Sequence, residues 1–131
     1  MKLKSFVEGS WFESSAAGAE LTDAVTGETV AEISSDGVDF AAMAEYARHV
    51  GGTKLREYTF HQRAEMLGAL AKFLNDKKPE LYALSTSTGA TRTDSWLDID
   101  GGIGTLFIYS SKGRREMLND HIYIDGPPEV I

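Results

Sequence analysis

The chain has 131 residues, 42% of them hydrophobic, which suits a single compact domain. Its formal net charge is -7, and Lys and Arg form no patch, which argues against nucleic acid or an anionic membrane surface as the partner. The absence of cysteine excludes disulfides, thiolate metal sites and a cysteine nucleophile within these residues.

Two β-hairpins are expected within residues 1–35. Short strands at residues 3–7 and 10–13 flank a turn at Glu8-Gly9. A second pair of strands surrounds Thr26-Gly27-Glu28, where the glycine offers the positive φ that a tight hairpin turn requires. The β-branched residues of this second pair are Val25, Val30 and Ile33.

The hydrophobic spacing then becomes helical, and residues 36–118 are expected to form a layer of about four helices. A cap for the first helix is available at Ser34, Ser35 or Asp36, and Gly51-Gly52 is expected to end it. Its apolar face consists of Phe40, Met43, Ala44, Ala47 and Val50.

A capping box formed by Thr59 and Gln62 predicts the start of the second helix. Its apolar face consists of Phe60, Ala64, Leu67, Ala71 and Leu74. Pro79 suits the first turn of a third helix, and Gly89 is expected to end that helix.

A fourth, long helix is expected from Thr91 to about Met117. Its apolar stripe consists of Trp96, Ile99, Ile103, Leu106 and Ser110. Three glycines lie inside it, and each costs about 0.5 to 1 kcal/mol relative to alanine in a helix. We therefore expect a neighbouring backbone to approach the smooth face around Gly101, Gly104 and Thr105.

The last segment, residues 119–131, alternates briefly as the start of a strand and breaks at Pro127-Pro128. Its partner strand would be expected further along the chain. No apolar run is long enough for a signal peptide or a membrane helix, so we expect a cytoplasmic location.

Neither the acidic residues nor the histidines have the sequence spacing that a metal site or an acid/base pair requires. Helix geometry places Asp94 and Asp98 on one side and Asp100 well away, which favours a solvated acidic face over a metal site or an acid/base pair. Asp94 also lies in a first helical turn, where a carboxylate is stabilised without any chemistry. Metal-ligand spacing is absent from His49, His61 and His121.

Two glycine-containing segments are weak candidates for phosphate binding. Gly101-Gly-Ile-Gly104 lacks the third glycine and the preceding strand of a dinucleotide loop, so a packing role is favoured. Thr88-Gly-Ala-Thr91 precedes a helix N-terminus, but a turn capped by Thr91 is favoured over an anion site. Lys112-Gly-Arg-Arg115 is expected to complement a helix C-terminus rather than to bind phosphate.

No nucleophile is expected, because no serine has a nucleophile-elbow pattern or a histidine nearby in the sequence. The large aromatic residues are interpreted as core or interface anchors, and these are Trp11, Trp96, Phe107 and Tyr109. We therefore assign no catalytic, cofactor-binding or metal-binding residue to this chain.

The segment Thr88-Gly-Ala-Thr-Arg92, followed by Asp94-Ser-Trp-Leu-Asp-Ile-Asp-Gly-Gly-Ile-Gly104, resembles the N-terminal part of a family of enzymes. These are the bifunctional phenylacetate-degradation proteins, in which an aldehyde dehydrogenase is fused to an oxepin-CoA hydrolase domain. Further likenesses to the aldehyde dehydrogenase superfamily are Phe6-Val-Glu-Gly-Ser-Trp11, the hairpin at residues 25–34 and Thr59-Phe-His-Gln-Arg-Ala64.

The resemblance implies an α+β fold in which residues 1–131 are an incomplete, N-terminal part of an aldehyde dehydrogenase domain. That superfamily oxidises aldehydes through a cysteine thiohemiacetal, hydride transfer to NAD(P) and a general-base glutamate. None of these groups can be located here, and the cofactor-binding strands are expected only after Ile131. We therefore expect a scaffold segment that binds no cofactor and is inactive alone, from an enzyme that uses NADP, or alternatively NAD, on a CoA-thioester semialdehyde.

The partners implied are the remainder of the dehydrogenase chain and further copies in a homo-oligomer, with no nucleic acid and no membrane. An apolar patch should be exposed where that remainder is absent. The alternative is a free-standing helical interaction or assembly module, in which the glycine face and Trp96 bind a partner protein.

Overall fold

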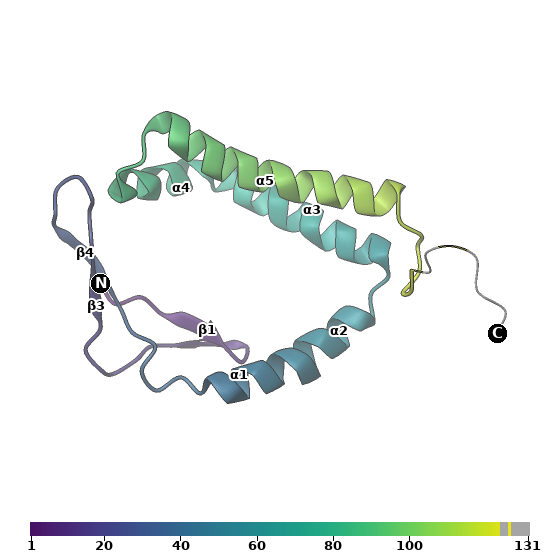
Figure 1. Cartoon of the computed structure of the whole chain (residues 1–131), viewed down its shortest axis with the longest axis horizontal. Coiled ribbons are helices and arrows are strands. Elements are labelled where there is room, and N and C mark those ends of the chain that lie inside the picture. The colour runs from purple at the N-terminus through teal and green to yellow at the C-terminus, as the bar shows by residue number, and fades with distance from the viewer. Residues whose placement is uncertain (124–125, 127–131) are drawn as a thin grey trace.

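The computed structural model describes residues 1–123 and 126, and its order of elements is α+β as expected (Figure 1). Two hairpins come first and helices follow. The strands are β1 (Ser5–Val7), β2 (Ser10–Phe12), β3 (Ala19–Thr22) and β4 (Thr29–Ile33). The helices are α1 (Phe40–Tyr46), the π-helical turn η1 (Ala47–Gly51), α2 (Gly52–Arg56), α3 (Phe60–Asp76), α4 (Lys78–Ser85), the 3-10 turn η2 (Thr86–Thr88) and α5 (Arg92–Arg115).

The first hairpin forms where the sequence predicted it. β1 and β2 are antiparallel, with Phe6 opposite Trp11. The turn residues Glu8 and Gly9 both have positive φ, 47° and 82°, which is the backbone of a tight two-residue hairpin turn. The Phe6 and Trp11 rings meet edge to face at 5.2 Å and remain 59% and 69% exposed.

The second hairpin is also confirmed, with a longer connection than expected. β3 and β4 are antiparallel, and Asp23 organises the turn because its Oδ1 accepts from the amides of Val25 at 2.8 Å and Thr26 at 3.0 Å. These two backbone bonds, Thr26 first, lower the pKa of Asp23. The prediction that Val25 contributes to a strand is therefore wrong, since its amide is used in the turn.

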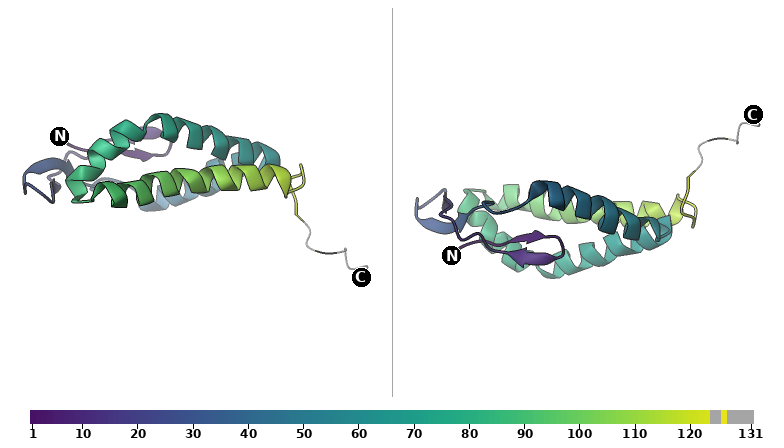
Figure 2. Two further views of the ribbon diagram at one scale, coloured as in Figure 1. Left: turned by 90° about the horizontal axis from the view of Figure 1, so that it is seen from above. Right: turned by 90° about the horizontal axis from the view of Figure 1, so that it is seen from below.

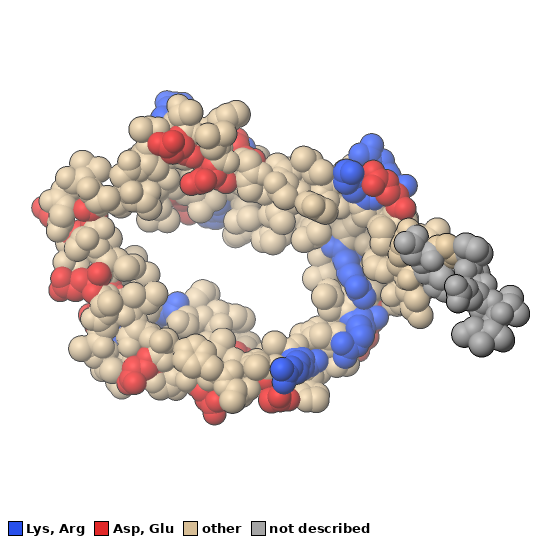
Figure 3. Space-filling model, viewed as in Figure 1, with Lys and Arg blue, Asp and Glu red and all other residues tan. Residues whose placement is uncertain are grey.

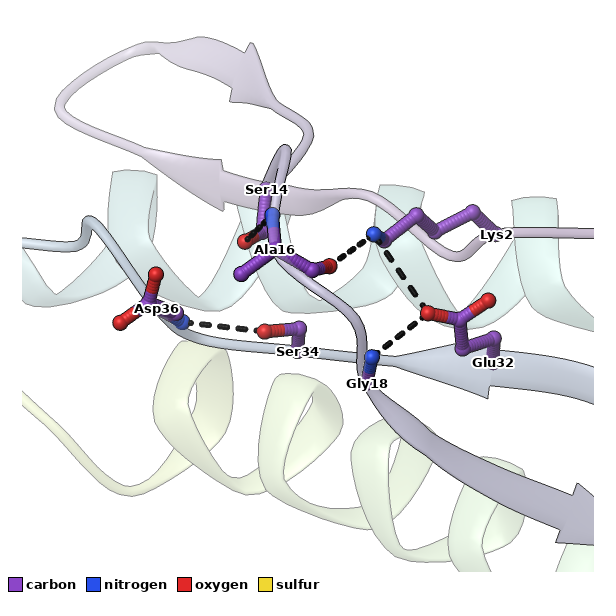
Figure 4. Close-up of polar contacts among 7 residues, drawn as sticks. All are labelled: Lys2, Ser14, Ala16, Gly18, Glu32, Ser34 and Asp36. Carbon is purple, nitrogen blue, oxygen red and sulfur yellow. Dashed lines mark hydrogen bonds and ion pairs between the residues drawn. The ribbon is translucent and has the colours of Figure 1, made fainter.

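The first residues of the chain are fixed to β4 by a polar cluster (Figure 4). The Glu32 carboxylate accepts from the Gly18 amide at 2.6 Å and lies 3.5 Å from the Lys2 ammonium, which also donates to the Ala16 carbonyl. The Gly18 amide, and then the Lys2 charge, lower the pKa of Glu32. The backbone of Glu32 bonds to Met1 and Leu3, so this cluster connects three segments.

The first helical stretch differs from the prediction at both ends. Its cap is Asp39, whose Oδ1 accepts from the Ala42 amide at 2.9 Å, whereas the Ser34 hydroxyl accepts from the Asp36 amide in a turn (Figure 4). Gly51-Gly52 does not end the stretch. Both glycines are right-handed helical, and a π-helical turn carries the backbone through them to Arg56. We call residues 40–56 the arm.

The α3–α5 pair is the closest-packed part of the molecule. Both helices begin with capping boxes, Thr59 with Gln62 as predicted and Thr91 with Asp94. Small residues separate the helices, because a Cβ added at Gly113 would lie 2.8 Å from the Ala64 Cβ. A Cβ at Gly68 would likewise lie 2.6 Å from the Ser110 hydroxyl.

The sequence analysis predicted the close approach at different glycines of α5, and that prediction is wrong. Apart from the neighbouring residues and backbone of α5 itself, no atom lies within 4 Å of a Cβ added at Gly101, Gly102 or Gly104, so no other described element approaches them. Trp96 was also predicted to lie in the inward stripe of α5, but it is 55% exposed and Ser95, at 2%, is buried instead. The stripe is rotated by one residue at this end because α4 packs there, and a serine fits the narrow space.

The third helix agrees with its prediction. Pro79 lies in the first turn of α4, and Gly89 ends the following η2 turn with a φ of 80°, a left-handed conformation that glycine adopts without strain. Basic residues occupy the last turn of α5, as expected, at Lys112, Arg114 and Arg115. The described residues 119–123 form no strand, and the rest of the strand predicted for residues 119–131 lies outside the described residues, apart from Gly126.

The elements surround an opening. α3 and α5 lie side by side in one layer, and the first hairpin and the arm lie opposite (Figures 1 and 2). At one end, the Ala24 amide donates to the Ser87 carbonyl at 2.8 Å and joins the second hairpin to η2. At the other end the arm runs into α3, and the Phe60 amide donates to the Asp120 carbonyl at 2.9 Å. In the space-filling view the opening passes through the molecule (Figure 3).

The described residues contain very little core. The buried apolar residues are Ala31, Ala64, Ala71 and Ile103, and no large side chain among the described residues is completely buried. The accessible surface is 9903 Å², whereas a folded monomer of this mass exposes roughly 6,800 Å². The expected aromatic anchors are all exposed, and these are Trp11, Trp96, Phe107 and Tyr109. Within the described residues, no helix is both long and apolar enough to cross a membrane.

The exposed apolar surface predicts self-association of the purified 131-residue chain. Exposed Leu, Phe and Trp side chains on both hairpins and on α3 and α5 should bind a hydrophobic dye strongly and join chains together. Light scattering after size exclusion is expected to give a mass above that of one chain. A monomer with weak dye binding would contradict this expectation.

The α3–α5 contact predicts opposite effects of alanine at two glycines of one helix. Gly113→Ala should lower the free energy of unfolding by about 1 kcal/mol, because overpacking costs about 1–3 kcal/mol and helix propensity offsets about 1 kcal/mol. Gly101→Ala, its matched control in open space, should raise it by about 0.5–1 kcal/mol. Urea titration followed by circular dichroism at low protein concentration measures both, and equal effects would refute the proposed contact.

Candidate functional site

The three aspartates of α5 have different roles in the structure. Asp94 forms the capping box, with its Oδ2 accepting from the Thr91 amide at 3.0 Å and from the Thr91 hydroxyl at 2.6 Å. These bonds, the hydroxyl first, lower the pKa of Asp94. Asp98 is exposed, and Asp100 is half-buried on another side of the helix, facing α4.

The helix N-terminus at residues 88–91 is therefore already occupied by a carboxylate of the chain itself. The Thr91 hydroxyl accepts from the Asp94 amide at 3.3 Å, so the predicted helix cap at Thr91 is confirmed. This arrangement leaves the anion-binding interpretation of the segment without support.

The most organised polar group is a cluster at the α4–α5 junction. Asp100 Oδ1 accepts from the Lys78 ammonium at 2.5 Å, and Asp100 Oδ2 accepts from the Tyr82 hydroxyl at 2.6 Å. The side chains of Lys78 and Asp100 are 27% and 28% exposed, so this ion pair is partly shielded from water. Lys78 and Tyr82 are one helical turn apart on α4, which lets both reach the same carboxylate.

Electrostatics keep this carboxylate ionised. The Lys78 hydrogen bond, followed by that from Tyr82, lowers the pKa of Asp100. The same Asp100 carboxylate raises the pKa of Tyr82, because the hydroxyl donates to it only while protonated. A carboxylate whose two oxygens both accept hydrogen bonds is a poor general base. The cluster of Lys78, Tyr82 and Asp100 instead joins α4 to α5, and we call it the pin.

A hollow of about 610 Å³ lies beside this pin. Its lining consists of Lys78, Pro79, Tyr82, Ala83, Thr86, Ala90, Arg92, Ser95 and Asp100. The hydroxyls of Ser85 and Ser95 lie 2.9 Å apart, and no histidine or cysteine lines the hollow to activate either one. The residue types present can position a polar group but do not constitute a nucleophile with its base.

Sequence reasoning missed this pin, although one signal was available. Asp100 was recognised as turned away from Asp94 and Asp98, which indicates a different neighbour for it. The identity of that neighbour depends on how α4 folds back on α5, and the chain gives no local sign of that angle.

The histidines lie in three separate places. His49 bonds to Glu45 at 3.0 Å within the arm, His61 to the Met117 carbonyl at 2.9 Å, and His121 to the Arg56 carbonyl at 3.2 Å. Over residues 1–123 and 126, no group of three or more His, Asp or Glu side chains is arranged to hold a metal ion.

The pin predicts a pH dependence of stability. Because the folded pKa of Asp100 is depressed, its contribution is present above the unfolded pKa and is lost as pH falls through the folded value. The raised pKa of Tyr82 limits the same pin on the alkaline side, where stability is lost as pH rises through the folded pKa of the hydroxyl.

Asp100→Asn should therefore lower the melting temperature at neutral pH and make it fall less steeply between about pH 5 and pH 2. Asp98→Asn, an exposed position on the same helix, is the matched control and should keep the parent profile. Thermal melts across this range measure both variants. Identical profiles for the two would show that the pin does not contribute to the pH dependence of stability.

Comparison with known proteins identifies the family of the chain. The sequence profile described as "Aldehyde dehydrogenase family" matches residues 11–127. A curated relative, the 3,4-dehydroadipyl-CoA semialdehyde dehydrogenase of Aromatoleum evansii, is 43% identical over 127 residues, which cover 96% of this chain and 25% of that protein. The chain thus spans about a quarter of the length of this relative. On the strength of both matches, the chain belongs to the aldehyde dehydrogenase family.

Proposed function

We propose that this chain is the N-terminal scaffold portion of an NAD(P)-dependent dehydrogenase that oxidises a CoA-thioester semialdehyde in aromatic catabolism. The observation that carries the proposal is the 43% identity, over nearly the whole chain, to a 3,4-dehydroadipyl-CoA semialdehyde dehydrogenase. The match to one quarter of that protein supports the view that the reacting groups lie in other parts of the enzyme.

The chemistry of the residues supports the scaffold role. Aldehyde oxidation needs a thiolate nucleophile and a base that activates water, and this chain has no cysteine. The nicotinamide cofactor accepts the hydride when it is bound to the whole enzyme. We propose NADP, or alternatively NAD, for that role and assign none of its contacts to these residues.

Within that role, the chain contributes rigidity. The close contact of α3 with α5 holds the two longest helices together, and the Asp100 pin fixes the direction of α4. The exposed apolar side chains supply surface against which the remainder of the dehydrogenase can pack. We also propose a cytoplasmic homo-oligomer.

The segment from Thr88 to Gly104 supports a narrower proposal, namely that the whole enzyme is a bifunctional phenylacetate-degradation dehydrogenase. The segment resembles the dehydrogenases of that kind, which carry an oxepin-CoA hydrolase domain. A ring-opened CoA semialdehyde is the substrate that such a pairing of domains supplies.

A second candidate is a free-standing helical interaction module. It is favoured by the open glycine face at Gly101, Gly102 and Gly104 and by the exposed Trp96 ring. The mass of the protein isolated from its native source separates the two candidates, because the module would be one short chain and the dehydrogenase several times larger.

The functional test compares the 131-residue chain with the polypeptide expressed from its complete native gene. The complete polypeptide is expected to reduce NADP with a CoA-thioester semialdehyde, and the 131-residue chain to give no turnover because it lacks the thiolate. The free semialdehyde without CoA is the control substrate and should react more slowly. Turnover by the 131-residue chain would contradict the scaffold proposal.

A further inference from the structure

Two adjoining hollows lie at the junction of α4 and α5. The hollow of about 610 Å³ beside the pin is next to a smaller recess of about 300 Å³. The recess is lined by Tyr82, Arg92, Thr93 and Trp96, and Tyr82 and Arg92 line both hollows. Volumes of about 300–1,000 Å³ are typical of small-molecule sites. The junction therefore has room for a ligand.

The recess has aromatic side chains from two helices. Trp96 lies four residues after Arg92, so the two side chains are neighbours on one face of α5. Tyr82 comes from α4, and it is half-buried, whereas Trp96 is 55% exposed. Aromatic side chains of this kind stack on the planar rings of nucleobases. The recess thus offers a stacking surface beside a guanidinium group.

The guanidinium of Arg92 is available to an anion. Among residues 1–123 and 126, none of the ion pairs involves Arg92. The Asp100 hydrogen bond raises the pKa of Tyr82 and the charge of Arg92 opposes that shift, which places the guanidinium near the Tyr82 hydroxyl. A guanidinium binds a phosphate group through two parallel hydrogen bonds.

The local charge of the junction is positive, although the chain as a whole is acidic. Lys78 and Arg92 bring two positive charges to the larger hollow, and Asp100 brings one negative charge. The Lys78 ammonium has three N–H donors and uses one of them on Asp100. Helix geometry places Asp94 and Asp98 on the other side of α5 from Arg92. A phosphate beside Arg92 therefore meets a net positive charge.

We propose that this junction binds the phosphoadenosine end of the CoA-thioester substrate, with the adenine ring against Trp96 and a phosphate on Arg92. We call the group Lys78, Tyr82, Arg92 and Trp96 the junction site. The inference rests on the proposed function, because the CoA thioester is the substrate proposed there. CoA combines an adenine ring with phosphate groups, and the junction site combines an aromatic surface with cations.

NADP has the same chemistry at its adenosine end and is the other source of such a group. Oxidation of the semialdehyde requires CoA thioester and NADP to be bound at the same time, so one of them occupies the junction site. The cofactor-binding strands are expected only after Ile131, which leaves the junction site to CoA. NADP is therefore an outcome that the test must distinguish.

The test measures binding of CoA itself to the complete polypeptide by isothermal titration calorimetry. Arg92→Gln should weaken CoA binding about tenfold, because it removes a charge-assisted hydrogen bond to phosphate. Trp96→Leu should weaken it about tenfold through the loss of stacking. Arg115→Gln, an exposed position in the last turn of the same helix, is the matched control and should keep the parent affinity. Pantetheine, which lacks the nucleotide end, should bind equally to every variant.

Each result decides the proposal. Equal CoA affinities of Arg92→Gln and Arg115→Gln would overturn it, as would a parent polypeptide that does not bind CoA. Weaker NADP binding with unchanged CoA binding would assign the junction site to the cofactor and also overturn it. If Arg92→Gln fails to fold, Arg92→Lys keeps the charge, removes the paired guanidinium bonds and should still weaken CoA binding severalfold.

Kinetics on the same preparations separate this inference from the proposed function. Arg92→Gln should raise KM for the CoA semialdehyde about tenfold and leave KM for the free semialdehyde unchanged. Turnover of the CoA semialdehyde with the same KM in Arg92→Gln and the parent would refute the junction site and leave the proposed function intact. CoA binding that depends on Arg92, without turnover of that substrate, would refute the proposed function and leave the junction site intact.

Discussion

The close contact between α3 and α5 is the constraint on which the remaining structure depends. Ala64 and Gly113 face each other across it, and Gly68 faces Ser110, so the two helix backbones approach without large side chains between them. Small residues bury little apolar area, and the contact therefore depends on its length and fit. It sets the direction of the layer, and the arm and the hairpins are attached at the two ends of that layer.

Polar contacts fix the ends of the apolar elements. Capping boxes start α3 and α5, the Asp100 cluster holds α4 at the start of the layer, and the Glu32 cluster fixes the first residues to β4. Such bonds select one geometry among several compact ones. They cannot replace a core, since most large apolar side chains here remain in contact with solvent. The described residues therefore have a defined shape without a large core to stabilise it.

Local signals were read correctly where the chemistry is local. The turn at Glu8-Gly9, the capping box at Thr59 and the break at Gly89 each depend on neighbouring residues alone, and the structure confirms them. The end of the first helix at Gly51-Gly52 was predicted wrongly because glycine permits a break without enforcing one. The Asp100 cluster was missed because its partners, Lys78 and Tyr82, come from a helix whose angle no local pattern specifies.

By itself, the sequence determined the order of hairpins and helices, most of their caps, and the absence of a thiolate from these residues. These properties follow from hydrogen bonds and spacings within a few residues. Only the tertiary structure decided which glycines separate helices, which side chains of α4 bind Asp100, and that the elements enclose an opening. The physical reason is that helix spacing identifies an apolar face, whereas what covers that face depends on segments far away along the chain.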